Sequence, residues 1–266
     1  MPKHLDHIVI LVTDLARASA DYADLGFTVT PGGAHTSGAT HNALITFADG
    51  TYFELIAFTD LAKAPSHRWG AQIAQGEGFI DFALLSDDLA AESIVRHPGV
   101  VPTNGPIEMG RLRPDDQRID WRIISLSATQ SALPFVIEDV TPRPLRVPDG
   151  AAMRHRLPVT HVAGVTVVVK DLAAVTTAYQ ALLGERGEET REAIAGAGAG
   201  RRFRIGEQWI ALVQVVDAAS ALGHYLATRG EGPYEVELGG DGVAPPGGGA
   251  LLSLAGTHGA RIRIAK

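Results

Sequence analysis

The sequence of 266 residues contains no cysteine. This absence excludes disulfide bonds and thiolate metal sites, although it says little about the cellular compartment.

Long apolar runs and dense basic stretches are also missing. The apolar run near the N-terminus, Ile8–Val12, has only five residues, which is too short for the hydrophobic part of a signal peptide or for a membrane span. Lysine and arginine number 23 against 30 acidic residues, a formal charge of −7, and they form no stripe. We therefore expect a cytoplasmic protein without a nucleic acid or membrane partner.

The composition that remains, 45% hydrophobic and 20% charged, is typical of a soluble globular protein. The length allows one large domain or two ordinary ones. Residues 141–158 hold four prolines and four arginines, so we place a boundary there between domains 1–140 and 159–266. We interpret this run as a solvated linker; an anion-binding patch of its arginines is the alternative.

The most informative stretch is Gly32–Ile56, a glycine-rich loop followed by two alternating apolar runs around Asp49-Gly50. An Asp-Gly pair between such runs predicts a β-hairpin. In the second strand of this hairpin, residues 52, 54 and 56 share one face. The carboxylate of Glu54 on that face either points to water or lines a polar site.

The hairpin completes a β-α-β-β-β order that recurs along the chain. The pair Asp14-Leu15, which we expect to begin the first helix, returns as Asp88-Leu89 and Asp171-Leu172, at offsets of 74 and 157 residues. A fourth module from about Tyr234 is reduced, because a glycine- and proline-rich stretch without a helical pattern follows its first strand. Repeats of this kind predict an α+β fold built from tandem βαβββ modules.

The opening DHIVILVTDL, the later LGFTV and the closing DGTYFELI resemble the vicinal oxygen chelate superfamily, which includes glyoxalase I, extradiol dioxygenases, fosfomycin-resistance enzymes and bleomycin-binding proteins. The stretch TPGGAHTSGATHNALITFADGTYFELI is similar to the glyoxalase-like domain family in particular. The resemblance covers residues 4–139 well, 160–216 moderately and 232–265 weakly. It implies that paired modules close curved mixed sheets into two cups, of which the second is degenerate.

The resemblance also implies a metal site with ligands from the first and last strand of each module. Carried over to this sequence, the positions are His7, Glu54, Asp81 and Glu138, a set that suits a divalent ion such as Zn, Mn, Ni or Fe(II). Asp81 stands where metal-binding relatives often have His or Gln, so its shorter side chain could lie outside the direct ligands. The structural alternatives are a core histidine at His7 and paired or surface acids at the three carboxylates.

Two histidines flank the glycine-rich loop, and their spacing is not a ligand signature. His41, at the start of a strand, is a candidate catalytic base together with Glu138, because both side chains can exchange protons. The alternative for His35 and His41 is a loop histidine hydrogen-bonded to the backbone.

Two functions follow from these residues. The first is a metal-dependent enzyme of the isomerase, lyase or dioxygenase type acting on a small oxygenated organic molecule. The alternative is a metal-free protein that sequesters a small molecule, as the bleomycin-binding relatives do. A chelator requires His7 and Glu54 to reach one point at roughly 2.0–2.2 Å, whereas a sequestering protein does not.

The C-terminal half offers no such donors. The residues equivalent to His7 and Glu54 are Gly164 and either Ile210 or Ala211. We therefore expect at most one metal site per chain, in residues 1–140. The second half would then serve packing, ligand shaping or the contacts of a homodimer.

Overall fold

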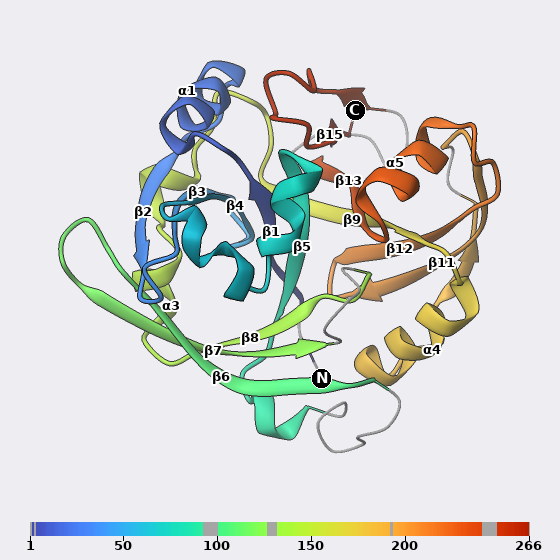
Figure 1. Cartoon of the computed structure of the whole chain (residues 1–266), viewed down its shortest axis with the longest axis horizontal. Helices are drawn as coiled ribbons and strands as arrows, with labels where there is room; N and C mark the ends of the chain where they lie inside the picture. Colours follow the sequence, from blue (N-terminus) through green and yellow to red (C-terminus); the bar gives the residue numbers. More distant parts are fainter. Residues whose placement is uncertain are drawn as a thin grey trace.

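The computed structural model describes residue 2 and residues 4–92, 101–126, 132–191, 194–240 and 249–265. Its strands form two curved mixed sheets that lie next to each other (Figure 1). This arrangement confirms the predicted α+β class with mixed sheets.

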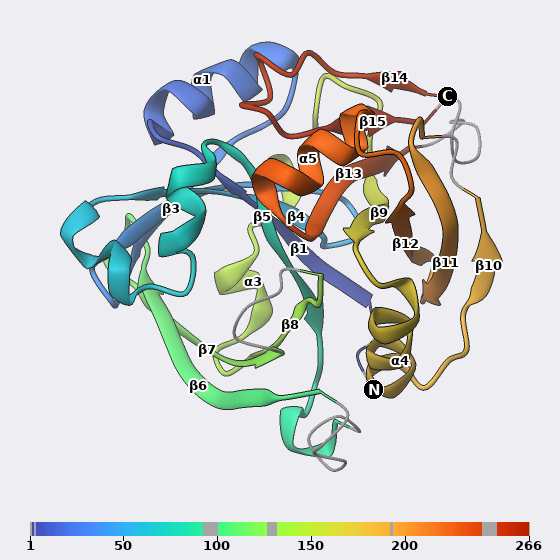
Figure 2. The same ribbon diagram turned by 45° about the vertical axis from the view of Figure 1, so that its right-hand side comes forward.

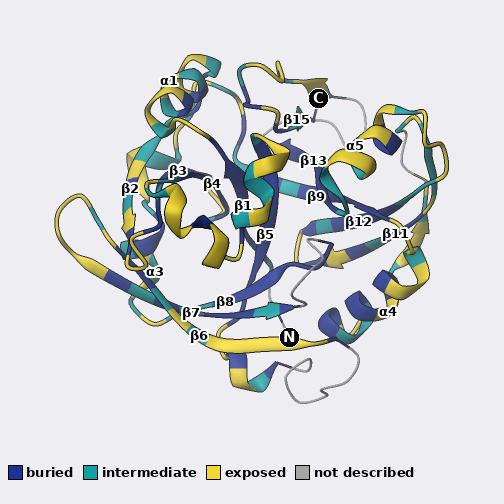
Figure 3. Cartoon of the chain, in the orientation of Figure 1, coloured by how far each residue is buried: buried dark blue, intermediate teal, exposed yellow. Residues whose placement is uncertain are grey.

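The first sheet is a closed barrel. Its strands are β1 (His4–Leu11), β2 (Thr30–His35), β3 (Thr40–Thr46), β4 (Tyr52–Phe58), β5 (Gly78–Leu85), β6 (Thr103–Leu112), β7 (Arg118–Leu126) and β8 (Phe135–Asp139). The order around the barrel is β1-β4-β3-β2-β6-β7-β8-β5, so that each module contributes one half of the wall. The strands β1 and β5, which join the two modules, are buried along most of their length (Figure 3).

The second sheet has seven strands. They are β9 (His161–Val169), β10 (Glu188–Thr190), β11 (Ala197–Ile205), β12 (Gln208–Val215), β13 (Gly232–Gly239), β14 (Ala250–Leu251) and β15 (Ile262–Ile264). Their order is β10-β11-β12-β9-β13-β15-β14. The short β14 and β15 are the remainder of the reduced fourth module.

Helices and short turns connect the strands of both sheets. The structure contains α1 (Leu15–Leu25), α3 (Arg143–Arg146), α4 (Leu172–Leu183) and α5 (Ala221–Arg229), with short 3-10 turns η1 (Leu61–Ser66), η2 (Gly70–Gln75), η3 (Leu89–Ala91) and η4 (Gly150–Met153). None of the helices in the described ranges is long and apolar enough to cross a membrane.

The repeated Asp-Leu pair begins each module helix for the same reason. The side chain of Asp14 accepts a hydrogen bond from the Arg17 backbone N–H at 3.0 Å, and Asp171 accepts one from Ala174 at 3.0 Å. Each aspartate thereby satisfies a free N–H group of the first turn. In the second module Asp88 caps only the short turn η3, and residues 93–100 lie outside the described part of the chain.

The two sheets share one hydrophobic core. Leu5, Ile8 and Phe53 of the barrel belong to the same buried cluster as Val165 and Val236 of the second sheet. Figure 2 shows β13 beside β5, and the Leu5 backbone N–H donates to the Gln208 side chain at 2.7 Å. The C-terminal half therefore supports the barrel wall from outside.

Two local expectations differ from the structure. The low-complexity sequence AIAGAGAG at residues 193–200 predicts a flexible loop, with a lid over a pocket as the alternative, but Ala197–Gly200 belongs to β11 and pairs with β12. Small residues are required there, because a Cβ atom on Gly200 would meet the Leu212 carbonyl oxygen at 2.8 Å. Helix α5, which has no repeat partner in the Asp-Leu pattern, was not predicted.

The strand register identifies which residues of the two halves correspond. His7 is paired with Tyr52 between β1 and β4, and Gly164 is paired with Trp209 between β9 and β12, at the same offset of 157 in both strands. The partner position of Glu54 is therefore Ala211. A Cβ atom on Gly164 would lie 2.1 Å from Cδ2 of Trp209, so the indole occupies the space that a side chain at the position of His7 would need.

We predict that Gly164→Ala destabilises the protein, because the added methyl group overlaps the Trp209 ring. Overpacking of this kind typically lowers the free energy of unfolding by about 1–3 kcal/mol. Urea denaturation measures the change. Gly256→Ala is the matched control, since its nearest contact would be the flexible Leu25 side chain at 3.3 Å. Equal stability of the two variants would contradict the assignment of Trp209 as the filling group.

Candidate functional site

The barrel surrounds a partly open cavity of about 50 Å³, space for several water molecules or the reactive part of a small ligand. Its polar lining includes His7, His35, Asn42, Glu54 and Arg111. Its apolar lining includes Met109, Trp121 and Phe135. Residues 67–69, between η1 and η2, also contribute to the lining, so the segment that links the two barrel modules forms part of the cavity wall.

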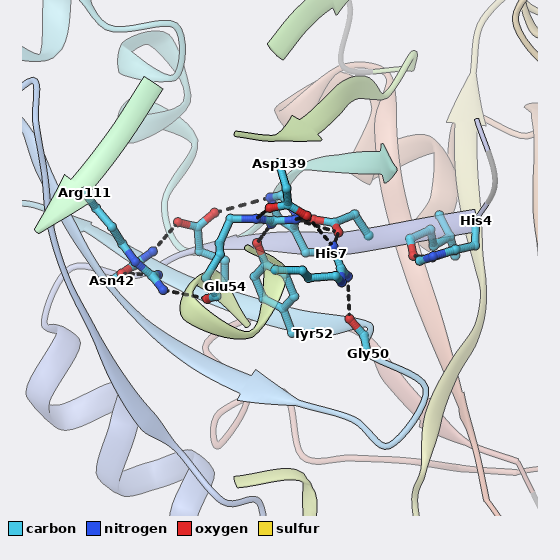
Figure 4. Close-up of polar contacts among 12 residues, drawn as sticks. His4, His7, Asn42, Gly50, Tyr52, Glu54, Arg111 and Asp139 are labelled. Carbon is cyan, nitrogen blue, oxygen red and sulfur yellow. Dashed lines mark hydrogen bonds and ion pairs between the residues drawn. The ribbon is translucent and has the colours of Figure 1, made fainter. Parts of the chain in front are cut away.

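Glu54 lies at the centre of this polar group (Figure 4). Nε2 of His7 is 3.5 Å from its Oε2 atom and Nε2 of His35 is 3.5 Å from its Oε1 atom. Asn42 donates a hydrogen bond of 2.6 Å to the same Oε1. Burial alone would raise the pKa of the Glu54 carboxyl, but the two histidines and the Asn42 hydrogen bond outweigh burial and hold the pKa below its ordinary value. Glu54 is therefore an ionised carboxylate inside the barrel.

His7 is oriented by the residue that precedes it. Nδ1 of His7 is 2.7 Å from Oδ2 of Asp6, although consecutive strand residues normally point to opposite faces. A register shift between Leu5 and His7 in the pairing of β1 with β5 permits this contact. On its other side, the His7 ring stacks on Tyr52, with ring centroids 4.6 Å apart and an interplanar angle of 14°.

The protonation of Asp6 determines which nitrogen of His7 is free. Burial would raise the pKa of Asp6, but Arg146 and Arg143 hold it well below the ordinary value, so Asp6 can only accept. Nδ1 of His7 therefore carries a hydrogen, and in a neutral ring Nε2 would present its lone pair to the Glu54 carboxylate. Two electron-rich groups at 3.5 Å repel each other, so this arrangement calls for a positive species between them: a proton on Nε2 or a metal ion.

The cations that balance Asp6 come from α3, within the run 141–158. Arg146 donates to Asp6 at 2.8 Å and to the Tyr52 hydroxyl at 2.7 Å, and it also pairs with Asp139. Arg143 donates to Asp6 as well. The interpretation of these two arginines as solvated linker residues is wrong, because the carboxylate of Asp6 is fully buried and needs direct counter-charges.

The other predicted site residues have their own partners. Asp81 accepts hydrogen bonds from Arg68 and from Trp69 Nε1, both at 2.8 Å, and burial raises its pKa despite these partners. Glu138 accepts from Arg122 at 2.8 Å, and its neighbour Ile137 lines the cavity, so Glu138 alternates to the outer face.

His41 is placed outside by the same alternation, since both of its neighbours, Thr40 and Asn42, line the cavity. In the described residues, no group of three His, Cys, Asp or Glu side chains converges closely enough to hold a metal ion. The structure thus brings together two of the four predicted ligands, and their metal-binding role stays a prediction.

Sequence reasoning missed His35, Arg111 and the pair Asp6–Arg146. His35 hydrogen-bonds Thr40 through Nδ1 at 2.8 Å, which directs Nε2 toward Glu54. No spacing rule reveals this contact, because it depends on β2, β3 and β4 lying side by side. Asn42 carried a usable signal: it is a polar residue beside the apolar part of β3, and it lies diagonally across the hairpin from Glu54, opposite Ile56.

Comparison with known proteins identifies relatives of the chain. A family described as "Glyoxalase-like domain" matches residues 5–183. A search of curated proteins found no match. A hypothetical protein from Staphylococcus aureus has a similar structure, with a TM-score of 0.72, 17% identity and coverage of 98% of both chains.

Two further solved structures share the fold. A mutant of 4-hydroxymandelate synthase from Streptomyces coelicolor has a TM-score of 0.61 at 14% identity, covering 91% of this chain and 72% of that one. A xylose isomerase-like TIM barrel/4-hydroxyphenylpyruvate dioxygenase fusion protein has a TM-score of 0.54 at 15% identity, covering 91% of this chain and 37% of that one. At these identities, the likeness establishes the fold.

We predict that Asp6→Asn destabilises the protein at neutral pH by about 3 kcal/mol, because Arg143 and Arg146 lose their fully buried counter-charge and keep only the partly exposed Asp139. The folded-state pKa of Asp6 is depressed, so its contribution is present above the unfolded pKa of about 3.9 and is lost as pH falls through the folded value. The difference between wild type and variant should therefore narrow in acid.

Urea denaturation at pH 7 and at steps down to pH 3 measures this difference. Asp115→Asn, which removes one partner of an exposed pair with Arg113, is the control and should change stability by less than about 1 kcal/mol. A variant Asp6→Asn as stable as wild type at pH 7 would show that the buried cluster does not stabilise the fold.

Proposed function

The chain belongs to the glyoxalase-like domain family, and from this premise we propose that its barrel is the active site of a divalent-metal-dependent enzyme acting on a small oxygenated organic molecule. Isomerase, lyase and dioxygenase reactions all remain within this proposal, since this fold supports many reactions. The proposal rests on one observation: Nε2 of His7 faces the ionised Glu54 carboxylate at 3.5 Å inside the barrel cavity.

This distance meets the requirement stated for a chelator. Two donors 3.5 Å apart can both reach one point at roughly 2.0–2.2 Å, the range of nitrogen and oxygen ligands of Zn. The Asp6 carboxylate behind His7 also fits, because metal-binding histidines usually donate their second ring N–H to such a group. A divalent ion held here would polarise neighbouring substrate oxygens and stabilise an enediolate or related anion.

The remaining residues of the cavity act around this pair. Burial lowers the pKa of His35, and its Nε2 lies 3.5 Å from Glu54, so the ring is placed to exchange a proton beside that carboxylate. Asn42 fixes the Glu54 carboxylate by its hydrogen bond of 2.6 Å. Phe135 packs edge-on against the His7 ring and Trp121 against the His35 ring, with ring centroids 5.3 Å and 6.0 Å apart, so both exclude water from these histidines. We therefore assign the proton-transfer role to His35 in place of His41 and Glu138, which lie outside.

The metal-free alternative also has support. The described residues contain no converged group of three metal ligands. A hydrogen on Nε2 of His7 could face the Glu54 carboxylate in place of a metal ion. The protein would then bind and sequester a small molecule in the same cavity. Metal affinity separates the two functions, because a sequestering protein has no need of a chelating pair.

We predict that protein purified without chelator binds about one equivalent of Zn, Mn, Ni or Fe(II), and that His7→Gln and Glu54→Gln each weaken binding more than tenfold, because each removes a ligand. Elemental analysis and isothermal titration calorimetry give stoichiometry and affinity. Glu138→Gln and His41→Gln are matched controls outside the cavity and should bind the ion like wild type. Less than about a tenth of an equivalent, with no uptake on addition of the four ions, would leave the sequestering protein as the function.

A further inference from the structure

Arg111 of β6 lines the cavity with most of its hydrogen-bonding capacity unused. Only 3% of the residue is exposed. Its Nη2 donates to the Arg146 carbonyl oxygen at 2.7 Å, and its Nη1 donates to Asn42 Oδ1 at 3.3 Å. Its buried Nε–H has no hydrogen-bond partner. A guanidinium carries five N–H donors, so this side chain retains donors for a ligand.

The other two arginines that line the cavity each donate a hydrogen bond to a carboxylate. Arg68 donates to Asp81 at 2.8 Å, and Arg146 donates to Asp6 at 2.8 Å. In the part of the chain that the structure describes, no carboxylate accepts a hydrogen bond from Arg111. A buried cation without a direct counter-charge is costly, and burial accordingly lowers the pKa of Arg111.

The nearest negative charge linked to Arg111 is that of Glu54, and Asn42 lies between the two side chains. Arg111 donates to the Asn42 carbonyl group, and the Asn42 amide donates to Glu54, so one carboxylate balances Arg111 at a distance while it directly faces His7 and His35. A positive species between His7 and Glu54 would take up this negative charge. The cavity would then hold a surplus positive charge at Arg111, which an anionic ligand group can neutralise.

The surface next to Arg111 is apolar. Met109 lies two residues earlier on β6 and therefore on the same face, and it is paired with Trp121 of β7. Phe135 lines the same cavity. Such walls suit a hydrocarbon or aromatic skeleton and do not suit a second charged group.

We infer that the ligand of this cavity is a small monocarboxylic acid, with its carboxylate bound by the Arg111 guanidinium and its carbon skeleton packed against Met109, Trp121 and Phe135. The planar fork of a guanidinium matches the two oxygens of a carboxylate. The inference rests on the proposed function in placing the ligand's reacting atoms beside Glu54. The binding of the carboxylate can nevertheless be measured without turnover and without metal.

The test uses metal-free protein and two matched pairs of probes: propanoate with propanamide, and benzoate with benzamide. The quenching of tryptophan fluorescence reports binding, since Trp69 and Trp121 line the cavity, and calorimetry gives the affinity. We expect each acid to bind wild type at least tenfold tighter than its amide. Arg111→Gln should abolish this preference, whereas Arg113→Gln, which removes a more exposed arginine paired with Asp115, should retain it.

Equal binding of acid and amide by wild type, or binding of neither, would overturn the inference and requires no variant to fold. A preference that survives in folded Arg111→Gln or Arg111→Lys would assign the carboxylate to another residue. Inorganic phosphate that competes with benzoate at equal affinity would overturn the choice of a carboxylate. Acid binding without metal uptake would overturn only the metal-dependent function, and metal uptake without acid preference would overturn only this inference.

Discussion

The burial of the Asp6 carboxylate is the constraint from which the arrangement of the barrel site follows. A fully buried carboxylate must have direct cations, and α3 supplies two of them from residues 137 and 140 positions further along the chain. The resulting cluster fixes the proton on Nδ1 of His7. Arg146 also binds the hydroxyl of Tyr52, whose ring stacks on His7. The two arginines connect the segment after β8 to the first strand. The arrangement of His7 beside Glu54 thus depends on a buried carboxylate and on two arginines from a distant part of the chain.

The repeat and the hairpin were visible in the sequence because they depend on local rules. An aspartate before Leu15 or Leu172 caps a helix wherever it occurs, and Asp49-Gly50 turns a hairpin without help from the rest of the chain. The family resemblance added the cup and the pairing of His7 with Glu54. The structure places these two residues on the neighbouring parallel strands β1 and β4.

The other site residues depend on contacts between distant parts of the chain. The polar residues and the Pro/Gly breaks around Arg111 predict a loop over residues 103–118, but Arg111 lies near the end of the long strand β6. Arg143 and Arg146 stood among prolines, where a charged residue is ordinarily solvated. Their role could not be inferred from the sequence. Their partner, Asp6, lies beside the register shift between Leu5 and His7 in β1, and no sequence pattern indicates that shift.

The exchange of His7 for Gly164 between the two halves has a consequence for engineering. The second sheet keeps the register of the first around this position, yet the Trp209 indole fills the space beside Gly164, and the Arg202 guanidinium stacks 4.4 Å from the ring centroid. A small residue in place of Trp209 would open a space beside Gly164. The backbone around that space has the same strand pairing as the backbone around His7. The C-terminal half therefore has the same strand register as the barrel strands that carry His7 and Glu54, but without their side chains. A new ligand site could be engineered there without altering the first.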